Sequence, residues 1–203
     1  MSGYEPFHTI AAETTEEIVV KGSRFVARAA PAGEKEQAEQ YIAAISSRFH
    51  DATHNCFAFK IGVGDQAVFR FGDAGEPSGT AGRPILQAIE NKNLTNLSVV
   101  VTRYFGGTKL GTGGLIRAYS AAALTALNRA KITVHFPQTV ITLKFAYSMT
   151  NPVHQVVEKF GAKILATRFE DQTFYRVRVK ASEEEKFKEE LLNLTSGKIS
   201  LIP

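Results

Sequence analysis

The sequence predicts an α+β fold in two domains, residues 1–137 and 138–203. Strand-like alternation and helix-like spacing of apolar residues are mixed along the whole chain, a pattern typical of sheets packed on helices. The length of 203 residues suits one large or two small domains, at roughly 150 residues per domain. Hydrophobic residues are 44% and charged residues 22% of the chain, proportions that exclude a collagen, a coiled coil or a largely disordered protein.

The first domain is expected to form an α/β sandwich of a sheet and several helices. Alternating apolar residues and clusters of β-branched residues predict strands at 18–30 (interrupted at Lys21-Gly22-Ser23), 54–61, 66–71 and 97–105. Apolar residues at helical spacing predict helices at 34–49 and 115–130. A shorter helix is expected to begin at Pro84, because proline is favoured at the first helical position.

The second domain has the pattern of a βαββαβ unit. Strands are expected at 139–146, 162–169, 173–181 and 198–202. One helix opens at Asn151-Pro152, and another follows Ser182, which we expect to be its N-cap because three glutamates come next. This order is the split-βαβ, ferredoxin-like arrangement. Its members are functionally so diverse that the fold by itself indicates no activity.

The composition limits the classes of protein further. Cys56 is the single cysteine, which excludes an internal disulfide and a cysteine-only zinc site. No apolar stretch approaches the ~20 residues that span a bilayer, and the first residues lack the basic and apolar parts of a signal peptide. We therefore expect a cytoplasmic protein with no membrane partner. The five histidines show no metal-ligand spacing, so neither a metal nor another cofactor is expected.

The distribution of charge is more informative than the net charge of +4. No Asp or Glu occurs from residue 91 to residue 157, a stretch that carries seven lysines and arginines. A segment of this length and one sign of charge predicts an anion-binding surface. The alternative is that carboxylates from other parts of the chain fold against this segment and neutralise it.

Two glycine-rich loops, 72–84 and 106–114, hold nine of the 16 glycines. Because glycine loses much conformational entropy on folding, such loops indicate either special backbone geometry or a ligand that approaches the main chain, as phosphates do. Neither loop contains a recognised nucleotide motif, but each leads into a predicted helix, whose N-terminus attracts anions. Positive side chains at helix starts oppose the dipole unless they share an external anion with it. On this ground we expect Arg83, Lys109 and Arg117 to belong to an anion site. The alternative is that the placement is harmless and that Arg117 simply points into solvent.

No catalytic residue can be assigned from the sequence. His54 and Cys56 lie two residues apart on a predicted strand and so face the same side. That placement suits a thiolate pair or, alternatively, a half-buried histidine beside an apolar thiol. Asp73 and Glu76 have the chemistry of an acid/base pair or of ligands for a divalent cation, but they could instead pair with nearby arginines.

Two segments carry a resemblance to a known family. They are Gly-Glu-Pro-Ser-Gly-Thr-Ala-Gly-Arg-Pro at 75–84 and Val-Val-Val-Thr-Arg-Tyr-Phe-Gly-Gly-Thr-Lys-Leu-Gly-Thr-Gly-Gly-Leu at 99–115. With Lys21-Gly-Ser-Arg-Phe25 and His54-Asn-Cys56, they make the chain similar to the IMPACT family in its bacterial, YigZ-type form. The resemblance implies a first domain like the second domain of small-subunit ribosomal protein five and a ferredoxin-like second domain like domain V of elongation factor G. It also implies nucleic-acid binding and a link to the control of translation.

The leading hypothesis is a non-enzymatic protein that binds RNA or the ribosome through a basic, glycine-rich surface. The expected surface residues are Arg83, Arg103, Tyr104, Gly106, Gly107, Lys109, Gly111, Gly113, Gly114 and Arg117, with Asp73 and Glu76 as candidate acidic partners. Tyr104 and the neighbouring Phe105 have rings that stack on bases, although strand alternation turns one of them inward. Two alternatives stay open: an enzyme or binder of a small phosphorylated ligand or nucleotide at the same loops, and a protein-docking module that acts through the sheet of the second domain.

Overall fold

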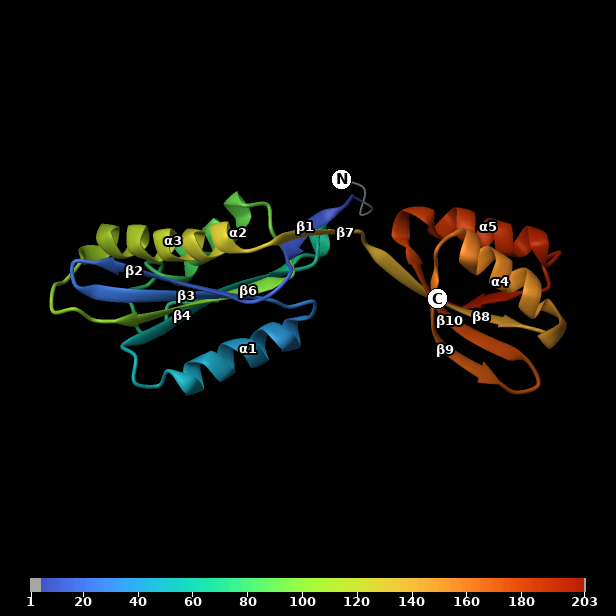
Figure 1. Cartoon of the computed structure of the whole chain (residues 1–203), viewed down its shortest axis with the longest axis horizontal. Coiled ribbons are helices and arrows are strands. Elements are labelled where there is room, and N and C mark those ends of the chain that lie inside the picture. The colour runs from blue at the N-terminus through green and yellow to red at the C-terminus, as the bar shows by residue number, and fades with distance from the viewer. Residues whose placement is uncertain (1–4, 203) are drawn as a thin grey trace. The chain divides into compact units, whose positions relative to one another are not determined.

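Figure 1 shows the computed structural model of the protein, which describes residues 5–202. The chain divides into two compact units, Phe7–His135 and a second unit that contains residues 136–202. Each unit has a hydrophobic core of its own. Among the described residues, no helix combines the length and the apolar character needed to cross a membrane.

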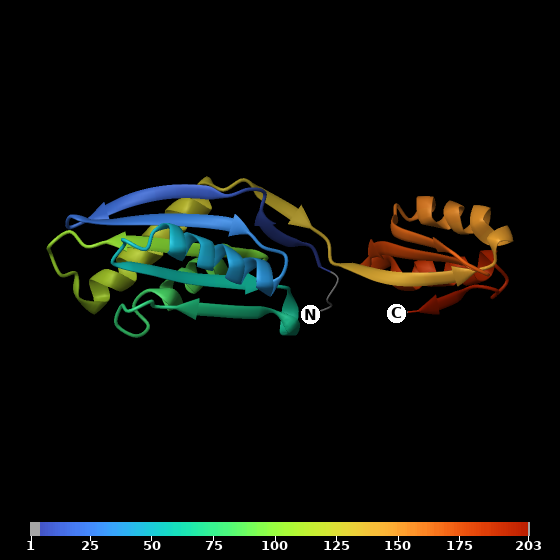
Figure 2. The ribbon, with the colours of Figure 1, turned by 90° about the horizontal axis from the view of Figure 1, so that it is seen from below.

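The first unit is built on an antiparallel five-stranded sheet with the order β2-β3-β6-β4-β5. Its strands are β2 (Thr14–Val20), β3 (Ser23–Pro31), β4 (His54–Ile61), β5 (Val68–Gly72) and β6 (Leu97–Tyr104). Figures 1 and 2 show two helices on one face, α2 (Gly82–Asn91) and α3 (Gly111–Arg129), and one on the other, α1 (Lys35–Arg48). The expected α/β sandwich therefore has helices on both faces of its sheet.

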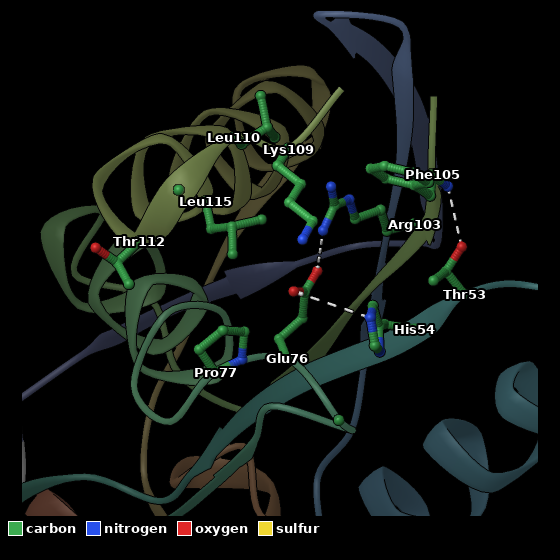
Figure 3. Close-up of a pocket in the computed structure, with 12 residues that line it drawn as sticks. Thr53, His54, Glu76, Pro77, Arg103, Phe105, Lys109, Leu110, Thr112 and Leu115 are labelled. Carbon is green, nitrogen blue, oxygen red and sulfur yellow. Dashed lines mark hydrogen bonds and ion pairs between the residues drawn. The ribbon is translucent and has the colours of Figure 1, made fainter. Parts of the chain in front are cut away.

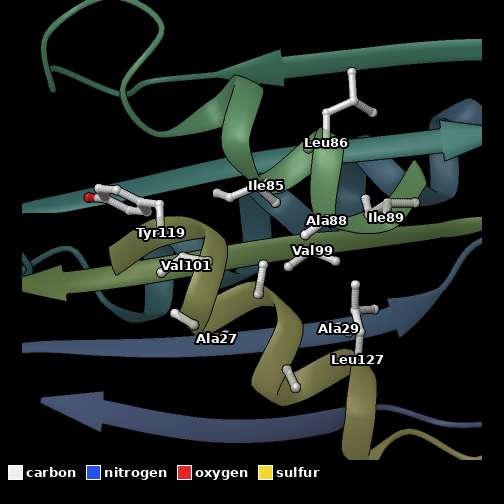
Figure 4. Close-up of a cluster of buried hydrophobic side chains, with 14 of the residues drawn as sticks. Ala27, Ala29, Ile85, Leu86, Ala88, Ile89, Val99, Val101, Tyr119 and Leu127 are labelled. Atoms are coloured by element: carbon white, nitrogen blue, oxygen red, sulfur yellow. The ribbon is translucent and has the colours of Figure 1, made fainter. Parts of the chain in front are cut away.

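The position of β6 in the middle of the sheet, with helices on both faces, explains why its sequence is so apolar. Val99 and Val101 pack in the larger core with α2 and α3, whereas Val100 packs in a smaller core with α1. Because the strand is covered on both faces, both sets of side chains are buried and the apolar–polar alternation is lost. Figure 4 shows the larger core. Small buried side chains of α3, among them Ala122 and Ala126, let the helix lie close to β3.

The second unit has the ferredoxin-like βαββαβ order that the sequence predicts. Its elements are β8 (Gln138–Phe145), α4 (Thr150–Lys159), β9 (Lys163–Phe169), β10 (Thr173–Lys180), α5 (Glu184–Leu194) and β11 (Ser200–Ile202). The strands form an antiparallel sheet in the order β11-β8-β10-β9. One face of this sheet packs on α4 and α5, where Val177 and Phe187 are fully buried.

Two short strands and one helix cap differ from the prediction. The strands β1 (Phe7–Ile10) and β7 (Ile132–His135) pair antiparallel in a two-stranded sheet. Each has only four residues, too few for a pattern, and their pairing joins distant parts of the chain. Ser182 is not the N-cap of α5, because it lies within a 3-10 turn (Ala181–Glu183) and Glu183 takes the cap position without a side-chain hydrogen bond.

Two helix starts also lie earlier than expected. The helix predicted from residue 115 begins at Gly111, so three glycines of the second loop belong to its first turn. Likewise α2 begins at Gly82, and Pro84 is its third residue. In both cases glycine, which has low helix propensity, conceals the first turn from a reading of the sequence.

Candidate functional site

A pocket of about 460 Å³ lies at one end of the five-stranded sheet (Figure 3). Four segments form it: the start of β4, the loop after β5, the end of β6, and the loop that leads into α3 together with the first turns of that helix. Its lining residues are Thr53, His54, Gly75, Glu76, Pro77, Arg103, Phe105, Lys109, Leu110, Gly111, Thr112 and Leu115. Because β4 and β6 are antiparallel neighbours with His54 opposite Arg103, the two glycine-rich loops, 72–84 and 106–114, meet at a single pocket.

A buried ion pair lines this pocket. Arg103 Nη1 donates to Glu76 Oε1 at 2.6 Å, and the two residues are only 5% and 8% exposed. Arg103 Nη2 donates to Ser23 Oγ at 3.3 Å, whereas the Arg103 Nε–H has no hydrogen-bond partner within residues 5–202. The expectation that Arg103 is an exposed, phosphate-facing cation is therefore wrong, because its charge is buried beside a carboxylate. The pairing corresponds to the alternative in which the loop acids meet arginines.

Tyr119 extends the ion pair into a buried network. Its hydroxyl donates to Glu76 Oε1 at 2.8 Å and lies 3.3 Å from Cys56 Sγ, which is also 2.9 Å from the carbonyl oxygen of Asp73. Burial raises the pKa of the Cys56 thiol to about 12 and also raises the pKa of the Tyr119 hydroxyl. Both groups therefore remain protonated at neutral pH and act as hydrogen-bond donors.

His54 contacts the loop after β5 rather than Cys56. Its Nδ1 lies 2.9 Å from the carbonyl oxygen of Ala74, a contact that requires a proton on this nitrogen. Its Nε2 lies 3.9 Å from Glu76 Oε2. The thiolate pair considered for His54 and Cys56 is thus not formed, since the thiol is protonated and has other partners.

Asp73 closes the N-terminus of α2. Its carboxylate accepts hydrogen bonds from the backbone N–H groups of Gly79, Ala81 and Gly82 at 2.8, 3.0 and 2.8 Å. Partial burial raises the pKa of Asp73, but these three hydrogen bonds outweigh it and hold the pKa below its ordinary value. The expectation that this helix start is free for an external anion is wrong, because the chain's own carboxylate occupies it.

Close backbone packing accounts for glycines in both loops. A Cβ built on Gly106 would lie 1.9 Å from the carbonyl carbon of Gly22, in the turn between β2 and β3. A Cβ on Gly82 would lie 2.7 Å from the backbone nitrogen of Gly72. No side chain fits at either position, so geometry explains these two glycines without a ligand.

The structure separates the predicted cations. Lys109 lines the pocket and is exposed, and so is the ring of Phe105. Arg83 and Arg117 are exposed but lie outside the lining, with the Arg117 guanidinium beside Gly113 in the first turn of α3. Within the described part of the chain, Lys109, Arg83 and Arg117 form no salt bridge.

Among the remaining predicted residues, Gly111 lines the pocket and Tyr104, Gly106, Gly107, Gly113 and Gly114 do not. The Tyr104 hydroxyl lies 3.4 Å from the carboxylate of Asp51, and the Arg24 guanidinium covers its ring. Strand alternation thus leaves Phe105, 49% exposed, as the aromatic side chain at the pocket.

Two residues of the buried network, Tyr119 and Ser23, are not among the site residues predicted from the sequence. Tyr119 lies on the apolar stripe of α3, where a tyrosine is indistinguishable from an ordinary core residue. Ser23 had a signal, since Lys21-Gly22-Ser23 interrupts a strand-like pattern and forms the turn that packs on Gly106. Its hydroxyl accepts hydrogen bonds from Arg103 and from the backbone N–H of Gly106.

The lining has a small positive formal charge and includes the start of a helix. Glu76, Arg103 and Lys109 give it a formal charge of +1 when His54 is neutral. The first turn of α3 at Gly111 and Thr112 adds backbone N–H groups that the helix leaves without partners. Within residues 5–202, no three His, Cys, Asp or Glu side chains lie close enough together to hold a metal ion.

Fold and site together define a two-domain α/β protein with a positively charged pocket in its first domain. Residues 21–127 match the family model described as the Impact N-terminal domain, and residues 143–198 match one described as a domain of unknown function (DUF1949). The chain therefore belongs to the IMPACT family, as its glycine-rich segments indicate.

Relatives and a solved structure match the chain over nearly its whole length. It is 31% identical to the IMPACT family member YvyE of Bacillus subtilis over 95% of this chain and 88% of that protein. It is 30% identical to the IMPACT family member YigZ of Escherichia coli over 90% of each. A crystal structure of a hypothetical protein superposes with a TM-score of 0.76 at 29% identity, covering 98% of this chain and 97% of the other.

Proposed function

We propose that this protein binds RNA, in connection with the regulation of translation, through the surface around the pocket. Membership of the IMPACT family supports a translation-related role at the level of the family. The observation that carries the proposal is the grouping of the exposed Lys109 and the exposed ring of Phe105 at one pocket. Cations contact phosphates, and an exposed ring stacks on a base.

The proposed RNA contacts lie at two places, the pocket and the start of α3. Lys109 and Arg117 lie before and within α3, so that a phosphate near its first turn would meet two cations and free backbone N–H groups. Arg103 is not itself a proposed contact, because its guanidinium is buried; its bonds to Glu76 and Ser23 hold the loop after β5 and the turn after β2 against the end of β6. Such contacts recognise the RNA backbone and its shape rather than its sequence.

The test measures how RNA binding depends on salt. Fluorescence anisotropy of the full chain with a labelled single-stranded RNA, repeated at several salt concentrations, gives the slope of log Kd against log salt. Replacing Lys109→Gln and Arg117→Gln together is expected to weaken binding and to reduce the slope by about 1.4, since each phosphate contact on a single strand contributes about 0.7. Arg103 stays unchanged, because truncating it would leave Glu76 buried without its partner.

The matched control removes the same charge from the other face of the sheet. Lys35→Gln with Arg48→Gln, both exposed on α1, is expected to leave the slope near that of the parent. Equal slopes for the two double variants would refute the surface proposed here.

A small phosphorylated ligand or nucleotide is the second candidate for the same pocket. The observation that favours it is the pocket's volume of about 460 Å³, within the ~300–1,000 Å³ typical of small-ligand sites. A thermal-shift screen of nucleotides separates the candidates: a nucleotide that stabilises the protein, with no RNA binding at low salt, would select this second function over the first.

A further inference from the structure

The sheet of the second unit has one face that carries no helix within residues 136–202 (Figure 1), called here the open sheet face. Strand alternation divides β10 between the two faces, so that Tyr175 and Val177 are buried while Arg176 and Arg178 are exposed. The pairing register extends the open sheet face across three strands, with Lys144, Phe174 and Arg168 in one row and Thr142, Arg176 and Ala166 in the next.

Three strands of the open sheet face, β8, β9 and β10, carry positive charges. Its six cationic residues are Lys144, Lys163, Arg168, Arg176, Arg178 and Lys180. None of the four strands contains Asp or Glu, since the acidic residues of 136–202 lie on the helices, in the 3-10 turn before α5 and in the turn between β9 and β10. Among the described residues, Arg168 alone of the six forms a salt bridge, with Glu170 at 3.1 Å. The fold therefore segregates positive charge onto this face.

An aromatic ring lies among these cations. Phe174 is half-buried, with Lys144 Nζ 5.6 Å and Arg168 Cζ 4.6 Å from its ring centroid. A hollow of about 290 Å³, bounded by Thr142, Phe174 and Arg176, opens beside the ring. A ring surrounded by cations on a sheet surface offers a base a stacking partner and the adjoining phosphates their counter-charges.

We infer that the open sheet face binds single-stranded RNA, with Phe174 as the stacking platform and Arg176, Arg178 and Lys144 as phosphate contacts. The inference rests on the proposed function for the class of partner, RNA, but it assigns a separate surface in the second unit. Single-stranded RNA fits better than a duplex, because only unpaired bases expose a face to a ring on a sheet.

The test uses the full chain, a labelled single-stranded RNA and anisotropy over a range of salt concentrations. Arg176→Gln with Arg178→Gln is expected to reduce the slope of log Kd against log salt by about 1.4. Phe174→Leu, which keeps an apolar side chain, is expected to weaken binding by about 5- to 150-fold without changing the slope, since stacking carries no charge. The control, Lys159→Gln with Lys186→Gln, removes the same charge from exposed positions on the helices α4 and α5, which cover the other face, and is expected to match the parent.

The outcomes separate this inference from the proposed function. If Arg176→Gln with Arg178→Gln binds like the control, the open sheet face is not an RNA site, whatever Lys109→Gln with Arg117→Gln does. If only the open-sheet-face variants weaken binding, the inference holds and the pocket surface fails. A Phe174→Leu variant that binds like the parent, together with equally tight binding of polyglutamate, would overturn the inference in favour of an acidic protein partner. A parent that binds no RNA at low salt overturns both.

Discussion

Glu76 and Arg103 stabilise each other at the pocket. Both side chains are almost wholly buried, and each neutralises the charge of the other. Glu76→Gln is expected to lower the free energy of unfolding by about 3 kcal/mol, since it leaves the Arg103 guanidinium buried without a counter-charge. Arg103→Met is expected to cost a similar amount by leaving the carboxylate uncompensated. Urea unfolding of the full chain measures both losses.

A double variant tests whether the loss of the ion pair causes the loss of stability in the two single variants. Glu76→Gln with Arg103→Met leaves no unpaired charge, and the remaining amide oxygen still accepts from Tyr119. Its loss of stability is therefore expected to be clearly smaller than the sum of the single losses. Additive losses would mean that each side chain acts separately.

The sequence predicts the strand that contains Arg103, but it does not predict that the Arg103 side chain is buried. In an alternating strand it would share a face with Val101 and Val99, but β6 is covered on both faces, so either face is interior. Its partner Glu76 comes from a loop that the sequence marks only by its glycines. The contact depends on β4 and β6 being neighbours, a long-range pairing that no local pattern specifies.

At the scale of elements, α2 depends on Asp73 for its start. Asp73→Ala is expected to cost about 2 kcal/mol at neutral pH, because three backbone N–H groups lose a charged acceptor. Since the folded-state pKa of Asp73 is lowered, its contribution is fully present above about pH 4 and is lost as the pH falls through the folded pKa. Urea unfolding of parent and variant should give a difference that shrinks in acid.

Asp73→Asn supplies the control for this prediction, because its carbonyl oxygen keeps one neutral acceptor at the helix start. It is expected to lose less stability than Asp73→Ala, and its loss too should shrink in acid. A penalty for Asp73→Ala that stays constant over the acid range would show that the carboxylate's charge has no part in holding α2.

The elements themselves were largely predictable, and the errors have physical causes. The order of strands and helices in 138–203 is confirmed because each element carries its own periodicity and its ends carry turn residues, such as Gly161 after α4. The starts of α2 and α3 were wrong because glycine obscures a first turn. The pair β1–β7 was missed because four-residue strands gain their stability from each other, across more than 100 residues of sequence.

At the scale of the whole molecule, the cores of the two units share no residue. Leu143→Ala truncates a fully buried side chain of β8 and is expected to lower the free energy of unfolding by about 2–5 kcal/mol. The loss is expected to be confined to the unit that contains residues 136–202. Hydrogen exchange followed by mass spectrometry measures this locally: peptides from β8 and β10 should lose protection, while those from β3 and β6 keep it. An equal loss of protection in β3 and β6 would contradict separate cores, because it requires the two units to unfold as one cooperative body.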